Sequence, residues 1–271
     1  MDAGRGGRLV ASLRAAPPWE HGCENEGLVE THLSWVLLAG PYAYKIKKPV
    51  DFGFVDFTTL ERRRHFLEEE LRLNRRLSDG WYLAVIPFHG APERPLLTDD
   101  GAPPFEYGLM MRRFPQSALL SANAGVAMDE PLVEQLADRV AAFHRSPDAA
   151  VAADDTPYGA PETVREMVEG NFVHIRALLP DGLLSRRVQR LHEREGARFE
   201  AFREMLAMRK ATGRIRELHG DLHRGNIAIV DGAPLLFDAL EFNPSFRWID
   251  PMAEDYKKRL SIAAAYHFAV V

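Results

Sequence analysis

The sequence predicts an α+β protein, because strand-like and helix-like patterns occupy different parts of the chain. Up to about residue 115, short apolar or alternating runs are separated by turns that contain Gly and Pro, as in an antiparallel sheet. From about residue 130, apolar residues recur at helical spacing in longer segments. With 46% apolar and 27% charged residues, the 271-residue chain has an ordinary globular composition.

The composition also narrows the partners and the compartment. A net charge of −5 argues against a surface built for nucleic acid, and no run approaches the roughly 18 apolar residues of a membrane span. Cys23 is the single cysteine, which excludes an intrachain disulfide, and residues 1–18 lack the apolar core of a signal peptide. We therefore expect a cytoplasmic protein with neither a nucleic-acid nor a membrane partner.

Two lysines follow the first predicted hairpin. Residues 29–40 read as a strand, a Gly-Pro pair breaks it, and residues 42–48 read as the returning strand. Lys45 and Lys47 are two positions apart and therefore share a face of that strand, whereas Lys48 points the other way. A solvated edge strand carrying lysines against aggregation is the simpler alternative.

The next segment predicts a long helix with a glutamate on its inward face. Thr58 and Glu61 match a capping box, and the helix is expected to run to about Leu77. Among three consecutive glutamates, Glu70 shares a helix face with Leu73 and Leu77, so we expect its side chain to point inward.

Further elements follow in order. Strands are predicted at 82–87 and 105–111, with a loop between them, and helices at the ranges 131–144, 161–178, 181–195 and 196–211.

The most informative stretch is residues 219–226, His-Gly-Asp-Leu-His-Arg-Gly-Asn. Asn226 opens an apolar strand that turns at Asp231-Gly232 and returns to Asp238, so a hairpin would bring Asn226 and Asp238 to one side. Together with Asp221, these residues offer three oxygen ligands near one point. Phosphoryl transfer from a Mg-bound nucleotide needs such a set. The alternative is that all three residues only cap turns and strand ends.

The pattern H-G-D-x-H-x-x-N at 219–226 resembles the catalytic loop of the aminoglycoside phosphotransferase and choline kinase group, a branch of the protein-kinase-like fold. The resemblance implies a two-lobed protein with a small antiparallel sheet lobe and a mainly helical lobe. It places a nucleotide-binding lobe at 26–115 and a helical lobe at 116–271. Relatives continue with further helices, so it also implies a shortened C-terminal lobe. Residues 1–25 are rich in Gly, Ala, Arg and Pro, which predicts a flexible lead-in with at most a short helix at 9–15.

The resemblance assigns roles in the catalytic loop and in the hairpin. It implies that Asp221 accepts or orients the proton of the attacking hydroxyl, and that Asn226 and Asp238 hold Mg²⁺. Arg224 would neutralise charge near the transferred phosphoryl group. Asp250 is expected to anchor the loop backbone.

It also assigns the nucleotide site. Lys45 would contact the phosphates of ATP or GTP, with Lys47 as the other candidate, and Glu70 would hold that lysine. The backbone of Met111, Arg112 and Arg113 would contact the purine edge. The acceptor would be a hydroxyl of a small molecule that the sequence does not identify.

More narrowly, residues 30–35, 44–49 and 241–244 look like an uncharacterised bacterial subgroup in which this domain often precedes a P-loop ATPase domain. Such a domain is a possible partner, although this chain contains no G-x-x-x-x-G-K-[ST] motif. A nucleotide-binding regulatory module with little catalysis is the alternative function. It is favoured by residues 38–41, which hold a single glycine where phosphate-covering loops often have two or three.

Overall fold

The computed structural model describes residues 3–19, 21, 27–121, 129–179 and 182–254, within two compact units. Unit 1 comprises residues 1–141 and 221–243, and unit 2 comprises residues 142–220 and 244–271. In this division the hairpin at 227–236 groups with the sheet, whereas the lobe boundary predicted from the sequence lies at residue 115. The Leu120 N–H, for example, donates to the Ile227 carbonyl.

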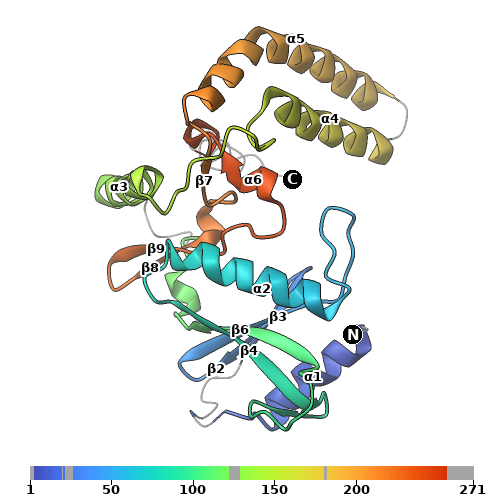
Figure 1. Cartoon of the computed structure of the whole chain (residues 1–271), viewed down its shortest axis with the longest axis vertical. Helices are drawn as coiled ribbons and strands as arrows, with labels where there is room; N and C mark the ends of the chain where they lie inside the picture. The colour runs from blue at the N-terminus through green and yellow to red at the C-terminus, as the bar shows by residue number, and fades with distance from the viewer. Residues whose placement is uncertain (1–2, 20, 22–26, 122–128, 180–181, 255–271) are drawn as a thin grey trace. The chain divides into compact units, whose positions relative to one another are not determined.

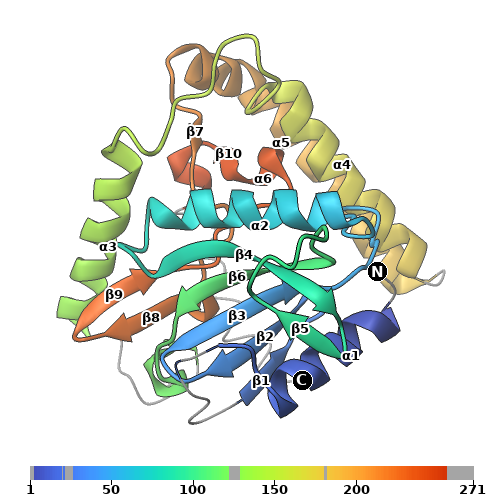
Figure 2. The ribbon, with the colours of Figure 1, turned by 60° about the horizontal axis from the view of Figure 1, so that its bottom comes forward.

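Unit 1 is built on a six-stranded antiparallel sheet with the order β1-β2-β3-β6-β4-β5 (Figures 1 and 2). The strands are β1 Gly27–Glu30, β2 Ser34–Ala39, β3 Tyr42–Lys47, β4 Tyr82–Ala91, β5 Arg94–Leu96 and β6 Glu106–Arg112. The α+β class is therefore confirmed. The single strand expected at 29–40 is wrong, because Thr31 ends β1 and its Oγ1 accepts the N–H groups of Leu33 and Ser34.

Helix α2, Leu60–Arg75, packs against β4 and β6 (Figure 2). Its cap is Thr59 rather than the expected Thr58: the Thr59 hydroxyl accepts the Arg62 N–H at 3.2 Å. Leu67 of α2 is fully buried in a cluster with Tyr82 and Leu109. This contact fixes the helix face that carries Glu70.

The N-terminal segment is not the loose lead-in that the sequence predicts. Residues Ala3–Ala15 form helix α1, which places Leu9 and Leu13 in a buried cluster with Tyr44 and Ile46 of β3. The apolar residues of α1 cover a sheet face that would otherwise expose aromatic side chains to water. Residues 22–26, which include Cys23, lie outside the described part of the chain.

The alternation of β3 divides its side chains between two environments. Tyr44 and Ile46 belong to the apolar cluster with α1, whereas Lys45 and Lys47 reach Glu70 of α2. Because successive side chains of a strand point to opposite faces, one six-residue strand serves both the core and a charged site.

The remaining elements of unit 1 follow β6 or lie in and after the loop 219–226. They are the 3₁₀ helices η1 Gln116–Ala118 and η2 Arg224–Asn226, the hairpin strands β8 Ile227–Val230 and β9 Ala233–Leu236, and the first residues of α3 Glu130–Arg145. The hairpin turn is the predicted one: Asp231 and Gly232 both have positive φ, 51° and 77°, as a two-residue type I′ turn requires.

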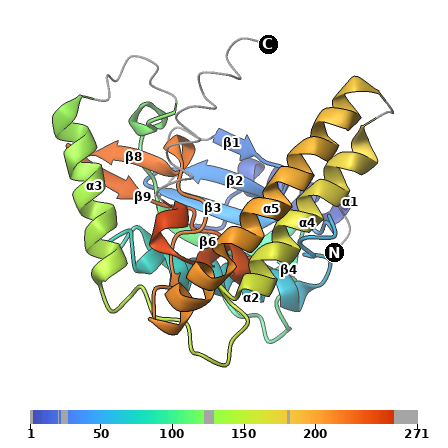
Figure 3. The same ribbon diagram turned by 90° about the horizontal axis from the view of Figure 1, so that it is seen from above.

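Unit 2 is mainly helical. Its elements are α4 Pro161–Leu178, α5 Leu183–Ala211, α6 Pro244–Arg247 and the short paired strands β7 Arg216–Glu217 and β10 Trp248–Ile249. Helices α4 and α5 lie side by side (Figures 1 and 3). The expected break near residue 195 is absent, because Gly196 sits inside a continuous helix of strong helix formers, at a cost of about 1 kcal/mol relative to alanine. Among the described residues, no helix has the length and apolarity needed to cross a bilayer.

Candidate active site

The site begins with the two lysines of β3, which share one carboxylate. Glu70 is fully buried and accepts from Lys45 Nζ at 2.7 Å on Oε1 and from Lys47 Nζ at 2.9 Å on Oε2. The structure thus brings Lys45 and Glu70 together as expected. It also places Lys47, the other candidate, on the second oxygen of the same carboxylate.

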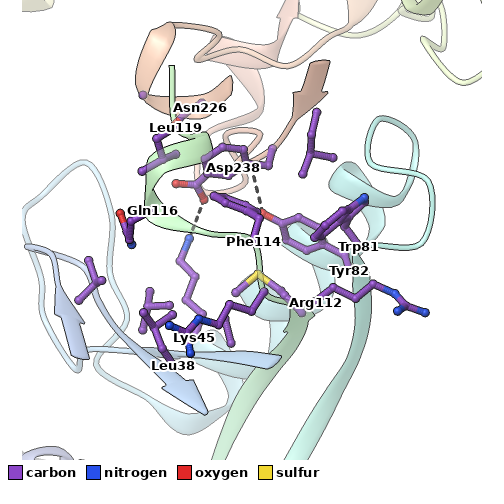
Figure 4. Close-up of a pocket in the computed structure, with 18 of the residues that line it drawn as sticks. Leu38, Lys45, Trp81, Tyr82, Arg112, Phe114, Gln116, Leu119, Asn226 and Asp238 are labelled. Carbon is purple, nitrogen blue, oxygen red and sulfur yellow. Dashed lines mark hydrogen bonds and ion pairs between the residues drawn. The ribbon is translucent and has the colours of Figure 1, made fainter. Parts of the chain in front are cut away.

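Asp238 meets this pair from the end of the hairpin. Its Oδ1 lies 2.6 Å from Lys45 Nζ, while its side chain remains 42% exposed at the rim of the site (Figure 4). The backbone of Asp238 is left-handed, with φ of 60°, which is uncommon for a residue with a side chain. The Asp238 N–H donates to the hydroxyl of the buried Tyr82 at 3.1 Å, so Tyr82 supports this conformation.

Asn226 connects the loop 219–226 to the hairpin. Its Nδ2 donates to the Asp221 carbonyl at 2.9 Å, and its own carbonyl accepts the Phe237 N–H at 3.1 Å. The Asn226 amide is therefore held by its nitrogen, which leaves Oδ1 available as a ligand. Asn226 and Asp238 both line the same pocket.

Asp221 and His223 form the exposed part of the loop. The Asp221 side chain is 53% exposed, and His223 Nε2 lies 3.6 Å from its Oδ2. His223 Nδ1 accepts the Gly225 N–H at 2.9 Å, so the imidazole is fixed from within the loop. Hydrogen bonding to Asp221 raises the pKa of His223, against the opposing effect of burial.

The charges of the site keep Lys45 protonated and the Tyr82 hydroxyl neutral. Burial alone would lower the pKa of Lys45, but the carboxylates of Asp238, Glu70 and Glu241 outweigh it and raise that pKa well above its ordinary value. Burial, followed by the carboxylates of Asp238 and Glu70, also raises the pKa of Tyr82 well above its ordinary value. Lys45 is therefore a permanent cation beside a neutral phenol.

A pocket of about 280 Å³ opens beside Lys45 and Asp238 (Figure 4). Its walls are mostly apolar, and they come from β1, β2, β3, the start of β4, the end of β6 with the segment after it, and the hairpin. The lining includes Val29, Val36, Leu38, Ala43, Trp81, Met111, Phe114, Leu235 and Phe237. An apolar pocket that also carries a cation and a carboxylate suits a heterocyclic base followed by an anionic chain.

The segment expected to contact a purine lines this pocket, but its amide donors are engaged elsewhere. The Arg112 N–H donates to the Trp81 carbonyl at 2.8 Å and the Arg113 N–H to the Pro41 carbonyl at 2.9 Å. Both bonds extend the sheet pairing past the end of β6. The next amide, that of Phe114, donates to no residue in the part of the chain that the structure describes, and it is the better candidate for a bond to a base.

Arg224 does not reach the pocket. Its Nη2 donates to the Leu120 carbonyl at 3.0 Å, and Arg224 is not among the residues that line the cavity. The guanidinium thus fastens the loop to the segment after η1. This contact does not favour the role in neutralising a phosphoryl group.

Two anchors differ from the sequence expectations or were missed. In unit 2, the Gly220 N–H donates to Glu254 Oε1 at 2.9 Å, so Glu254 anchors the loop backbone. Asp250, the expected anchor, pairs with Arg209 instead. In unit 1, Glu241 accepts from Lys47 at 2.6 Å. Two lysines on one strand face were the signal that more than one buried carboxylate should face them.

Comparisons with known proteins name no function for this chain. No family model matches it. Uncharacterized proteins of Mycobacterium tuberculosis and Mycobacterium bovis are 33% identical to it over 224 residues, which cover 82% of this chain and 42% of each relative. The chain therefore spans less than half the length of these relatives. An ethanolamine kinase from Plasmodium vivax aligns with 93% of this chain and 65% of its own, at a TM-score of 0.39 and 9% identity.

Proposed function

We propose that this chain is a Mg²⁺-dependent phosphotransferase that moves the γ-phosphoryl group of ATP or GTP to a hydroxyl of a small molecule. The observation that carries the proposal is the bridge made by Lys45, whose ammonium joins the buried Glu70 to the half-exposed Asp238 at the mouth of an apolar pocket. Because two carboxylates hold this ammonium group in place, it is suited to bind phosphate oxygens without moving.

The pocket accounts for the nucleotide. Its apolar walls bury the base, and the Phe114 N–H offers a donor to the base edge. Lys45 then lies where the phosphates would emerge, and Glu70 prevents its side chain from moving with them. Orientation of this kind supplies much of the catalysis in phosphoryl transfer.

The donor set fits a hard divalent cation. Asp238 offers a carboxylate at the rim and Asn226 an amide oxygen, and Mg²⁺ prefers oxygen ligands of these kinds together with phosphates and water. The cluster beneath contains two ammonium groups, Lys45 and Lys47, and three carboxylates, Glu70, Asp238 and Glu241, so it carries one net negative charge that a cation would offset. Mg²⁺ held there would neutralise charge on the transferred group.

Asp221 would accept the proton of the attacking hydroxyl. The attacking hydroxyl oxygen forms a bond to the γ-phosphorus, the bond from phosphorus to the β,γ-bridging oxygen breaks, and the hydroxyl proton passes to the Asp221 carboxylate. Its exposure leaves room for an acceptor, and His223 and Asn226 on either side hold the loop that carries it.

A regulatory nucleotide-binding module is the second candidate, and the turn after β1 favours it. This turn has no glycine, and the N–H groups of Leu33 and Ser34 are engaged with Thr31 Oγ1, so they do not point at a phosphate. The Gly40–Pro41 turn, expected to cover phosphates, instead joins β2 to β3. Such a module would bind Mg-nucleotide without consuming it.

The test compares wild type with Asp221→Asn and Asp238→Asn for nucleotide binding and for ADP or GDP release, over a panel of small alcohols. We expect Asp221→Asn to bind Mg-nucleotide without turnover and Asp238→Asn to lose the Mg²⁺ dependence of binding. Asp231→Asn, the same change in the exposed hairpin turn, is the control. Binding by wild type without turnover on any acceptor favours the module, and no binding refutes both functions.

The partner and the location stay predictions. The P-loop ATPase domain implied by the resemblance would be tested by measuring turnover with the longer relatives, which extend beyond the aligned region.

A further inference from the structure

The proposed mechanism assigns no role to Lys47, although it is among the most deeply buried cations of the chain. Its side chain is 1% exposed, and its Nζ lies 2.9 Å from Glu70 Oε2 and 2.6 Å from Glu241 Oε1. The same nitrogen lies 4.8 Å from the centre of the Phe57 ring. Burial lowers the pKa of Lys47, but Glu241 and Glu70 more than offset this and raise it, so the group stays charged.

An ion pair of this kind is an expensive way to stabilise a core. Removing two charges from water costs several kcal/mol, and a well-packed apolar pair of similar volume often stabilises as much. The pair therefore calls for an explanation in terms of position rather than of stability alone. What it joins is specific: β3, helix α2 and the segment that directly follows Asp238.

That segment is fastened at three successive points. The Asp238 N–H donates to the Tyr82 hydroxyl at 3.1 Å, the Ala239 N–H to Asn74 Oδ1 at 3.0 Å, and Glu241 accepts from Lys47. Asn74 lies one helical turn after Glu70, and its Nδ2 donates to the Glu70 carbonyl at 2.8 Å. The left-handed conformation at Asp238 is thus fixed from one side by a phenol and from the other by the Lys47–Glu241 pair.

We propose that Lys47 and Glu241 are positioning residues that latch the segment 238–241 onto α2 and β3, and so hold the Asp238 carboxylate in the position proposed for metal binding. The expected effect on metal binding rests on the proposed function. The claim that the Lys47–Glu241 pair orders the segment 238–241 does not depend on it.

The experiment separates the latch from general stability with a double variant. Lys47→Met alone leaves two buried carboxylates short of a partner and is expected to destabilise strongly, whereas Lys47→Met/Glu241→Met restores an apolar contact of similar volume and recovers most of the melting temperature. If the pair is a latch, the double variant should still need about 10–100-fold more Mg²⁺ than wild type for half-maximal nucleotide binding. Losses of this size are typical when a residue that orients a metal ligand is replaced. Metal-free nucleotide binding should change little.

The control removes another buried ion pair in the same unit. Arg63 and Glu106 are 0% and 1% exposed and make contacts of 3.0–3.1 Å between α2 and β6, with Arg63 two helical turns before Glu70. Arg63→Met/Glu106→Leu should leave the Mg²⁺ dependence unchanged. A Lys47→Met/Glu241→Met protein with normal Mg²⁺ dependence, or a control with the same shift, would overturn the proposal.

Amide hydrogen exchange provides the readout that does not depend on activity. The Asp238 and Ala239 amides should exchange about tenfold faster or more in the double variant than in wild type, with the β2–β3 amides unchanged. If wild type binds no nucleotide, the proposed function fails, and this exchange still decides the latch: unchanged protection at 238 and 239 refutes it, and a local loss supports it.

Discussion

Replacement of Tyr82 by Phe tests how the Asp238 carboxylate, the proposed metal ligand, is supported, because it removes a single oxygen atom. Tyr82 is 4% exposed, and its hydroxyl accepts the Asp238 N–H at 3.1 Å. A buried donor that loses its acceptor costs about 1–3 kcal/mol, and we take the lower half because the bond is only partly buried. At roughly 2–4 °C per kcal/mol for a chain of this size, the melting temperature should fall by about 2–8 °C.

The same variant should weaken Mg²⁺-dependent nucleotide binding. Asp238 has φ of 60°, a conformation that costs of order 1–3 kcal/mol and persists only when its surroundings hold it. A loss of about 1 kcal/mol of support corresponds to roughly fivefold weaker binding. Differential scanning fluorimetry and calorimetric titration, each with and without Mg²⁺, measure the two effects.

Tyr42→Phe is the matched control, since the Tyr42 hydroxyl bonds to no described residue while its ring packs on the same sheet. Equal losses in both variants, or an unchanged melting temperature and Mg²⁺ dependence in Tyr82→Phe, would show that the phenol does not support Asp238.

Three further predictions follow from buried or coupled charges. Glu106→Gln should lower the free energy of unfolding by about 3–5 kcal/mol, because it leaves the buried Arg63 unpaired; a loss below 1 kcal/mol in urea unfolding would contradict this. The raised pKa of His223 means that its protonated form stabilises the folded state. This stabilisation is complete below the ordinary pKa of about 6.5 and is lost as the pH rises through the raised pKa. The difference in melting temperature between wild type and Asp221→Asn should therefore shrink from pH 5.5 to 8.5. Burial would raise the pKa of Glu254, but a hydrogen bond from His144 and its other partners lower it. Glu254→Gln should therefore lower the free energy of unfolding by roughly 1–3 kcal/mol at neutral pH, and this difference from wild type should narrow as the pH falls below about 4.5. A difference that stays constant with pH would argue against an ionised Glu254.

Where local pattern decided the outcome, the sequence was a good guide. The two-residue spacing placed Lys45 and Lys47 on one strand face and the helical period turned Glu70 inward, while the family resemblance supplied the expectation that a lysine and this glutamate would meet. The Asp231-Gly232 turn predicted the hairpin that carries Asp238. Apart from that expectation, each of these inferences needs only the period of one element or the geometry of one turn.

Long-range contacts were not predictable in the same way. Glu241 lies 194 positions from Lys47, so no local pattern reveals their pairing. Helix α1 resembles a Gly- and Arg-rich tail until the sheet face that needs its leucines is known. The amides of Arg112 and Arg113 were expected to be available, and only the sheet register shows that neighbouring carbonyls already use them.

The two-faced strand β3 has a consequence for how this chain can vary. Inserting or deleting one residue in the β2–β3 turn would shift the pairing register and exchange the two sets of side chains, burying Tyr44 against Glu70 and pressing Lys45 among the aromatic rings below α1. Changes of even length preserve the facing of each side chain. Functional homologues should therefore accept length changes at this turn in pairs. An alignment that puts a single gap there marks either an error or a protein that has lost the lysine proposed here to bind phosphate.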